Sequence, residues 1–490
     1  MISVREVDPS DDATFRSWYD AFHAAAVDSR PAAFVANWDA LSSSLRNPGP
    51  AKRRIPVGAF DGDRLIGAML FEYPLIGDPD TVDVEIDVPP AERRRGAGTL
   101  LWRWATARAA ELGRTIFQAE LGVPKTGRPW PASVFAAGLG FTIGNVEDHF
   151  VVPLPYDADR LARLRSDAGE LTGYRLTSWV GPCPEEHLQA YADLRTAMDV
   201  DVPSGEMTRN PEPWTVERLR PNEERMAKNY VTLVTMVHTD AGAPAGYTLI
   251  YLMPGDPDNA LQDDTLVLRD HRGHNLGTHL KLANLDQLAK HRTSQSLLHT
   301  WTAQSNAPMQ KVNARFGFEF AEELHELERT TPNLRPAARA VVLDRDDRIL
   351  LLRFAFGDRP DVWAAPGGGV EAGESLPQAL TRELVEEIGL TPPADPPHLW
   401  HQEVVAEGHA AGYDGVINDY FLVRVDSHTP GGTMSADELL AENVHGHRWW
   451  PLQELESYDG PDVFSPRALP VYLADLLASG PPSSPHLIGL

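Results

Sequence analysis

The stretch Gly368–Leu390, which reads GGVEAGESLPQALTRELVEEIGL, is the most informative segment of the chain. Its first residues are rich in glycine, and helix-forming residues follow. Ser375 is a natural N-cap residue, Pro377 is tolerated in a first helical turn, and Gly389 suits a helix end. The stretch therefore predicts a loop followed by a helix over about 376–388.

This helix is expected to have one apolar and one acidic side. Apolar residues recur at every fourth position and predict a buried stripe: Leu376, Leu380, Leu384 and Ile388. Glu383, Glu386 and Glu387 fall at i, i+3 and i+4, so their carboxylates project together. Like charges at this spacing repel each other by about 0.2 to 0.5 kcal/mol per pair unless a cation joins them. A hard divalent cation is the natural partner, and a solvated acidic helix is the alternative.

The full pattern of glycines, Arg382 and glutamates matches the Nudix box at every defined position. The surrounding region, residues 335–480, resembles a Nudix hydrolase, with strand-like and helical segments in the order of that family. The resemblance implies a mixed sheet between helices and a reaction that requires Mg²⁺ or Mn²⁺. In that reaction, water attacks a phosphorus of a nucleoside diphosphate that is linked to another group.

The resemblance also implies a set of metal ligands. Glu386 and Glu387 would bind the metal together with the main-chain carbonyl of Gly367. Members of the family often add a glutamate from a distant loop. Glu442 is the candidate for this role and Glu438 is the second choice, although an exposed glutamate without a function is the alternative for both.

Three further residues of the box receive catalytic or supporting roles from the same resemblance. Glu383 would either bind a second metal ion or accept the proton of the attacking water. Arg382 would hold the carboxylates in register through charge-assisted hydrogen bonds. Glu374 would support the loop or bind a further metal ion.

The first third of the chain carries a different ligand loop. Residues 82–88 alternate apolar and acidic side chains, as in a half-buried strand, and lead through Arg93–Gly98 (RRRGAG) into a helical stretch. Glycines at such a turn allow close approach of the main chain, and a helix N-terminus favours phosphate. The order resembles the GNAT acetyltransferase fold, in which this loop holds the pyrophosphate of acetyl-CoA. The implied cofactor-binding residues are Val88, Arg93, Arg94, Arg95, Gly96, Ala97 and Gly98.

The middle third repeats this order of elements. Arg272 lies 179 residues after Arg93, and Gly317 lies 177 residues after Gly140, which indicates an internal duplication. The sequence thus resembles a tandem pair of GNAT domains, expected at residues 1–155 and 172–330. In the second copy the implied cofactor-binding residues are Arg272, Gly273, Asn275 and Gly277, and Asn275 replaces the middle glycine of the motif.

Both copies depart from the family at the catalytic positions. Many family members carry a tyrosine that protonates the departing thiolate, and the corresponding residues here are Ala136 and Asn313. Glu85 in the first copy and Asp264 in the second lie on the strand before the loop, where the family often places the base that takes a proton from an amine. A solvated carboxylate on a strand face is the alternative. Without the tyrosines, acetyl transfer would rely on another acid or on solvent, or one or both copies would be degenerate.

Composition limits the remaining possibilities. A chain of 490 residues predicts about three domains, here of mixed α/β (α+β) class. The net charge of −26 argues against a general nucleic-acid or membrane-surface partner. Cys183 is the only cysteine, and the sequence shows neither a leader nor an apolar run of membrane length, so a cytoplasmic protein is expected. The tail 481–490 is rich in proline and serine and is expected to be mobile.

Two other functions fit the same residues. In the first, the Nudix-like region senses a nucleotide and the GNAT pair gives the response. In the second, the chain is chiefly an acetyltransferase and the Nudix-like region is a passenger. The intact set Glu383, Glu386 and Glu387 favours hydrolysis over sensing, because a sensor does not need the hydrolytic residues.

Overall fold

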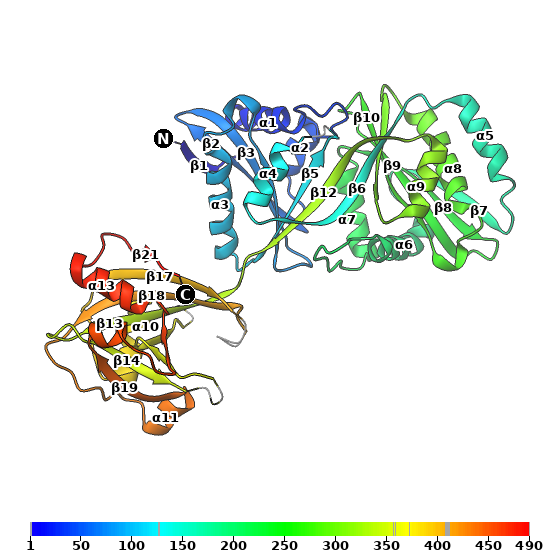
Figure 1. Ribbon diagram of the computed structural model, residues 1–490. Coiled ribbons are helices and arrows are strands. Elements are labelled where there is room, and N and C mark those ends of the chain that lie inside the picture. Colours follow the sequence, from blue (N-terminus) through cyan, green and yellow to red (C-terminus); the bar gives the residue numbers. More distant parts are fainter. Residues whose placement is uncertain are drawn as a thin grey trace. The chain divides into compact units, whose positions relative to one another are not determined.

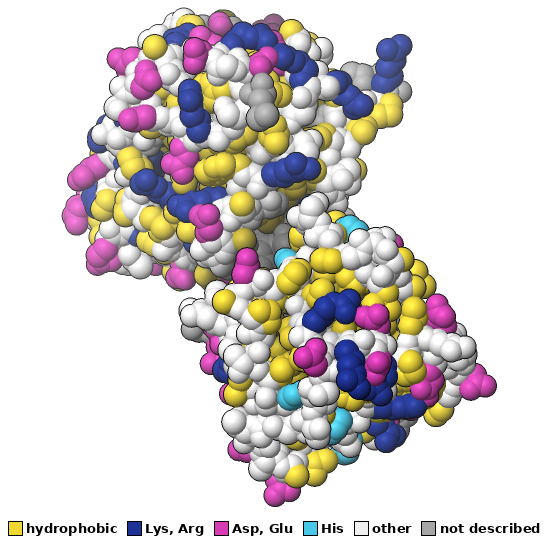
Figure 2. All heavy atoms as spheres, turned by 90° about the vertical axis from the view of Figure 1, so that its left-hand side faces the viewer, with side chains coloured by type: hydrophobic (Ala, Val, Ile, Leu, Met, Phe, Trp, Pro, Cys, Tyr) yellow, Lys and Arg dark blue, Asp and Glu magenta, His cyan; other side chains and the backbone are white. Residues whose placement is uncertain are grey.

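The structure is a computed structural model that describes residues 2–125, 128–355, 357, 359–371, 373–406 and 412–489. The chain divides into two compact units, Met1–Thr331 and Pro332–Leu490. Figure 1 shows the helices and strands of each unit. On the face drawn in Figure 2, basic and acidic side chains are interspersed with apolar and neutral groups. Among the described residues, no helix is long and apolar enough to cross a membrane.

The first unit consists of two successive runs of similar elements. The first run contains β1 (Ile2–Glu6), α1 (Asp12–Ala26), α2 (Trp38–Arg46), β2 (Lys52–Asp61), β3 (Arg64–Pro74), β4 (Thr81–Asp87), α3 (Ala97–Glu111), β5 (Ile116–Val123), α4 (Pro131–Gly138) and β6 (Thr142–Pro153). Helix α5 (Ala158–Ala168) follows. The second run contains β7 (Tyr174–Val180), α6 (Leu188–Asp201), α7 (Val216–Met226), β8 (Val231–Thr239), β9 (Pro244–Leu252), β10 (Asn259–Val267), α8 (Leu276–His291), β11 (Leu297–Ala303), α9 (Ala307–Phe316) and β12 (Glu319–Thr330). The two runs follow the predicted duplication element by element.

The two runs share one sheet of 12 strands in the order β1-β2-β3-β4-β5-β12-β6-β11-β10-β9-β8-β7. The last strand of each run pairs with the other run, because β12 lies beside β5 and β6 lies beside β11. Strands β6 and β12 also pair with each other in the middle of the sheet, where Figure 1 shows them crossing between the two groups of helices. The predicted division into residues 1–155 and 172–330 therefore runs through a continuous sheet.

Helices cover both faces of this sheet and supply its core. In the first run, Leu101 and Trp102 of α3 pack on one face, and Phe15 and Trp18 of α1 pack on the other. In the second run, α8 packs against β8 and β9, and α6 lies against β9. Burying a large apolar side chain stabilises a fold by about 1.5 to 3 kcal/mol, so these contacts position the loops before α3 and α8 firmly.

A buried polar network crosses the exchanged strands. Arg30 donates to both carboxylate oxygens of Glu322 on β12, at 2.9 and 2.6 Å. The Nδ1 atom of His149 on β6 lies 3.4 Å from the same carboxylate. His149 Nε2 is 2.9 Å from His299 Nδ1 on β11, and His299 Nε2 is 2.8 Å from Asn259 Oδ1 on β10. The network connects both runs through side chains far apart in sequence.

The second unit contains a smaller mixed sheet. Its elements are β13 (Leu334–Leu343), β14 (Ile349–Phe354), β15 (Val362–Ala364), β16 (Gly367–Gly369), α10 (Leu376–Glu387), β17 (His398–Val405), β18 (Gly415–Arg424), α11 (Ala436–Ala441), β19 (Val444–Trp450), α12 (Leu452–Glu456), β20 (Val463–Ser465), α13 (Leu469–Ser479) and β21 (His486–Leu487). The strands follow the order β20-β15-β14-β13-β18-β17-β21, with β16 on β13 and β19 on β14.

Helix α10 matches the helix expected from the sequence. It begins after a capping box formed by Ser375 and Gln378, and its apolar stripe packs on the sheet through Leu380, Leu384 and the following Ile388. Helix α13 belongs to the core cluster that includes Trp450. Trp450 is fully buried in this cluster.

The C-terminal tail was expected to be mobile, but part of it pairs with the sheet. Strand β21 lies parallel to β17, with Trp400 opposite His486 and His401 opposite Leu487. Beyond the strand, the main-chain N–H of Ile488 donates to the carbonyl of His401. Composition alone did not indicate this pairing, because main-chain hydrogen bonds do not depend on the side chains that make the tail polar.

Candidate functional site

The residues of the box converge where the glycines of β16 lie against the second half of α10. Strand β16 consists of three glycines and pairs with β13, where Gly367 lies opposite Arg339. Gly367 has a φ of 125°, and a Cβ atom there would lie 2.2 Å from the carbonyl oxygen of Ala338. A Cβ atom at Gly368 would lie 2.5 Å from Glu383 Oε1. Glycine is therefore required for the strand to lie this close to both β13 and α10.

Arg382 organises the carboxylates around it. Its Nε and Nη2 atoms each donate to one oxygen of Glu374 at 3.0 Å. Its Nη1 atom donates to Glu383 Oε1 at 2.8 Å and to Glu386 Oε2 at 3.2 Å. Nη2 also donates to the carbonyl of Gly369 at 2.8 Å. These hydrogen bonds raise the pKa of Arg382 and lower the pKa of Glu374. One guanidinium thus joins the loop before α10 to the acidic side of the helix.

Glu387 lies beneath this cluster and is 6% exposed. The N–H of Gly367 donates to Glu387 Oε2 at 2.7 Å. Burial, together with the charges of Glu383 and Glu442, raises the pKa of Glu387 to about 8. Burial also raises the pKa of Glu383, and Glu442 and Glu386 add to this rise.

Glu442, at the end of α11, therefore lies near enough to α10 to affect two of its carboxylates. Glu438, the second choice from the sequence, accepts hydrogen bonds from the N–H and hydroxyl of Ser435 instead. It caps its own helix.

The donor set at α10 suits a hard divalent cation. Within the described ranges, no group of three or more His, Cys, Asp or Glu side chains stands ready-made to hold a metal ion. Nevertheless, the charges of Glu383 and Glu442 raise the pKa of Glu387, and the charge of Glu442 also raises the pKa of Glu383. Such crowding of carboxylates is relieved by a cation, and oxygen ligands are those that Mg²⁺ and Mn²⁺ prefer. The carboxylates at α10 therefore have the chemistry needed to bind Mg²⁺ or Mn²⁺.

The two predicted ligand loops of the first unit have the same main-chain conformation. Arg94 and Gly96 have φ values of 64° and 91°, and Gly273 and Asn275, at the equivalent positions, have 86° and 58°. Asparagine tolerates this left-handed conformation better than most residues, so Asn275 preserves the turn. Neither α3 nor α8 has a side-chain cap, which leaves their first N–H groups directed at the loop.

Arg93, Arg95 and Arg272 of these loops form ion pairs. Arg93 donates to the carbonyl of Val88 at 3.0 Å and pairs with Asp28 at 3.0 Å. Arg272 donates to the carbonyl of Val267 at 3.0 Å and pairs with Asp201. Arg95 pairs with Asp61 at 2.6 Å and with Glu92. Arg93 and Arg272 therefore hold the turns in shape through equivalent contacts.

The two predicted base residues lie in different surroundings. Glu85 is exposed on β4, just beyond the part of this strand that pairs with β5. Asp264 accepts from the hydroxyl of Tyr247 at 2.5 Å and pairs with Arg195 at 3.5 Å. No motif in the sequence indicated these contacts. A β-bulge between Gln262 and Thr265 changes the direction in which the strand presents its acidic residues.

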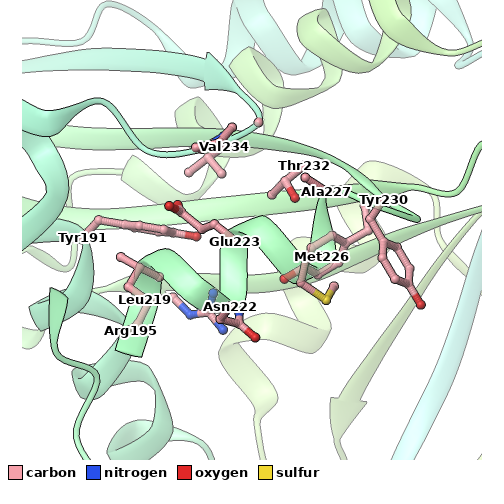
Figure 3. Close-up of a pocket in the computed structure, with 13 residues that line it drawn as sticks. Tyr191, Arg195, Leu219, Asn222, Glu223, Met226, Ala227, Tyr230, Thr232 and Val234 are labelled. Carbon is pink, nitrogen blue, oxygen red and sulfur yellow. The ribbon is translucent and has the colours of Figure 1, made fainter. Parts of the chain in front are cut away.

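A pocket that the sequence did not indicate lies beside Arg195. Figure 3 shows side chains of α6 and α7 facing β8, with Tyr191, Arg195, Glu223 and Tyr230 among the lining residues. Glu223 accepts from the N–H of Cys183 at 2.9 Å and from Arg220 at 3.0 Å. The lining comes from four separate segments, and this separation explains why no motif revealed it.

Asn313, in the place of the family tyrosine, is buried and donates to Thr302 at 2.9 Å.

Comparisons with known proteins agree with this geometry. The profile of the "NUDIX domain" family matches residues 333–470, and that of the "Acetyltransferase (GNAT) family" matches residues 200–318. An RNA pyrophosphohydrolase of a Nitratiruptor species is 33% identical over 133 residues, which cover 25% of this chain and 82% of that protein. The chain belongs to the Nudix family.

Other relatives are matched over a smaller part of their length. An RNA pyrophosphohydrolase of Campylobacter jejuni is 35% identical over 104 residues, which are 19% of this chain and 64% of that protein. Among solved structures, a tandem GNAT protein from the clavulanic acid biosynthesis pathway is 29% identical, with a TM-score of 0.57. This match covers 67% of the chain and 98% of the solved protein. The chain thus combines a GNAT domain with a C-terminal Nudix domain.

Proposed function

We propose that the Nudix domain is a pyrophosphohydrolase that uses Mg²⁺ or Mn²⁺ and acts on a nucleoside diphosphate linked to another group. The observation that supports this most directly is the joint placement of Arg382, Glu383 and Glu387 around the glycines of β16. The relatives are RNA pyrophosphohydrolases, so the 5′ end of an RNA belongs among the candidate substrates. The acidic composition still favours a small nucleotide over a long nucleic acid.

Each residue has a specific part in this reaction. When bound, the cation supplies charge neutralisation for the phosphate and a more acidic water. Glu386, Glu387, Glu442 and the carbonyl of Gly367 would hold it. Glu383 accepts a proton from water, and its raised pKa suits a base that works near neutral pH. Arg382 keeps Glu383 in place, and Glu374 anchors Arg382 at the loop.

The test is release of phosphate or pyrophosphate from a panel of nucleoside triphosphates, dinucleoside polyphosphates, ADP-ribose, NADH, CoA and RNA with a 5′-triphosphate. The control is the double variant Glu386→Gln and Glu387→Gln, which keeps the helix but removes two ligand charges. We expect metal-dependent release that falls at least about 100-fold in the double variant. Binding of a nucleotide without any release would favour the sensing function instead.

For the first unit we propose acetyl transfer from acetyl-CoA to an amine, centred on the second copy. This copy is matched by the GNAT family profile and keeps the left-handed turn at Asn275 despite the substitution. The supporting observation is the uncapped start of α8 behind that turn. The first copy has the same turn before α3 and is a second candidate for acetyl-CoA binding.

The two loops can be compared with matched variants. A Cβ atom at Gly277 would meet nothing nearer than 4.0 Å, so Gly277→Glu adds a negative charge at the start of α8 without a clash. Gly98→Glu places the same charge at the equivalent position of α3, near Phe135 at 3.2 Å. If the second copy binds acetyl-CoA, Gly277→Glu should abolish the thermal shift that acetyl-CoA causes, and Gly98→Glu should leave it. The reverse pattern would assign binding to the first copy, and no shift in the parent chain would contradict acetyl transfer.

A further inference from the structure

Arg339 on β13 connects three strands of the Nudix domain. Its Nη1 atom donates to the carbonyls of Ala365, at 2.9 Å, and Gly367, at 3.1 Å. Its Nε atom donates to Asn418 Oδ1 on β18 at 2.9 Å. The side chain is partly buried, and the residues that follow it on β13, up to Leu343, are buried and apolar. Burying an arginine in such a strand destabilises the fold unless its N–H groups donate hydrogen bonds. Here two nitrogens of Arg339 donate three hydrogen bonds.

One of the residues that Arg339 contacts, Gly367, also contacts Glu387 of α10. Gly367 accepts from Arg339 through its carbonyl and donates to Glu387 through its N–H. The positive charge of Arg339 also favours the ionised form of Glu387. Movement of the segment from Ala365 to Gly367 would therefore shift both the Gly367 carbonyl and the partner of the buried carboxylate.

We propose that Arg339 is a positioning residue for the divalent cation of the Nudix domain. Arg339 holds the carbonyl of Gly367, while the N–H of the same residue donates to Glu387, so that the carbonyl and the carboxylate are held in one arrangement. The proposal rests on the proposed pyrophosphohydrolase function and adds a residue outside the box to it. Groups that orient ligands in this way typically change metal affinity by about 10- to 100-fold when they are removed.

The test is the affinity of the full-length chain for Mn²⁺, measured by electron paramagnetic resonance, so that the result does not depend on a substrate. Arg339→Met keeps the length of the side chain but removes its hydrogen bonds. We expect this variant to bind Mn²⁺ at least about 10-fold more weakly than the parent chain. Arg339→Lys should recover only part of the affinity, because an ammonium cannot reproduce the fixed fork of a guanidinium. In steady-state assays, added Mn²⁺ should restore kcat, and the KM for the nucleotide should change little.

A matched control lies on the neighbouring strand. Arg353 of β14 is partly exposed and pairs with Asp361, so Arg353→Met should leave the affinity for Mn²⁺ unchanged. Asn418→Ala removes the Nε partner of Arg339, along with the hydrogen bond from Asn418 to Gln402, and leaves the contacts of Nη1. It should weaken binding by a smaller factor, which keeps the test usable if Arg339→Met does not fold.

The outcomes separate the two proposals. Equal affinity for Mn²⁺ in Arg339→Met and the parent chain would overturn the role of Arg339. Binding of Mn²⁺ with the expected loss in the variant, but no hydrolysis of any compound in the panel, would overturn only the pyrophosphohydrolase function. Failure of the parent chain to bind Mn²⁺ would overturn both.

Discussion

Glu387→Gln is expected to make the Nudix domain more stable above pH 8 and at the same time to remove most of its hydrolytic activity. The carboxyl group of Glu387 is buried and its pKa is raised from 4.5 to about 8. A pKa that is raised in the folded state means that the protonated form is favoured there. The buried, protonated carboxyl group of Glu387 makes its full contribution to stability below about pH 4.5, and this contribution is lost as the pH rises through about 8.

A neutral glutamine avoids this loss and keeps an acceptor for the N–H of Gly367. In buffer with EDTA at pH 9, we expect the free energy of unfolding of the Nudix domain to rise by about 2 kcal/mol in Glu387→Gln. The difference should shrink towards pH 5. Chemical denaturation at several pH values measures this, and Glu454→Gln, which neutralises a partly exposed glutamate of α12, is the control. Lower stability of Glu387→Gln at pH 9 would contradict the prediction.

The same substitution should reduce pyrophosphate release by at least about 100-fold at saturating Mg²⁺, because a ligand charge is lost. In the parent chain, a cation must displace the proton from Glu387, so the affinity for metal should increase with pH up to about 8. Full activity of Glu387→Gln would show that this carboxylate does not take part in the reaction.

Glu322→Ala is expected to destabilise the first unit by about 3 to 5 kcal/mol, because it leaves the buried guanidinium of Arg30 without its partner. The loss should be large since Glu322 lies on β12, the strand that the second copy contributes to the middle of the shared sheet. Urea denaturation of the full-length chain measures it. Glu319→Ala removes an exposed carboxylate from the same strand and should change the stability by less than about 0.5 kcal/mol.

The pH dependence of this pair follows from the pKa of Glu322. Burial opposes ionisation, but the hydrogen bonds from Arg30 and His149 outweigh it and lower the pKa from 4.5 to about 2. A lowered pKa stabilises the folded state above about pH 4.5, and this contribution is lost as the pH falls towards about 2. In Glu322→Ala this part of the acid sensitivity should disappear. An unchanged acid-unfolding curve would contradict the role assigned to the pair.

Several parts of the candidate site could be predicted from the sequence because short-range interactions determine them. Ser375 and Gln378 form the capping box of α10, and Leu380 and Leu384 repeat with its turn, so the helix and its acidic side follow from local spacing. The equivalent left-handed turns before α3 and α8 follow in the same way from glycines and Asn275 between a strand and a helix. Arg339 carried a weaker signal, because it is a charged residue among the alanines and valines of β13 and belongs to no motif.

Other features depend on contacts between distant segments. The sequence suggested Glu442 as a metal ligand only because it is a glutamate outside the box. Its position near α10 depends on how α11 packs. Asp264 lies on the predicted strand, but the bulge in β10 directs it to Arg195 and Tyr247, and neither partner is recognisable from spacing.

Local spacing in the chain was thus sufficient to predict the Nudix box helix, the duplication of the first unit and the residue types available for metal and phosphate. The exchange of β6 and β12 between the two copies, in contrast, became visible only in the folded sheet. The physical reason is that main-chain hydrogen bonds are the same for any pair of strands, so an alternating sequence specifies which face is buried but not which neighbour it joins. That choice depends on buried side-chain contacts such as Arg30 with Glu322, which form only once the whole sheet is assembled.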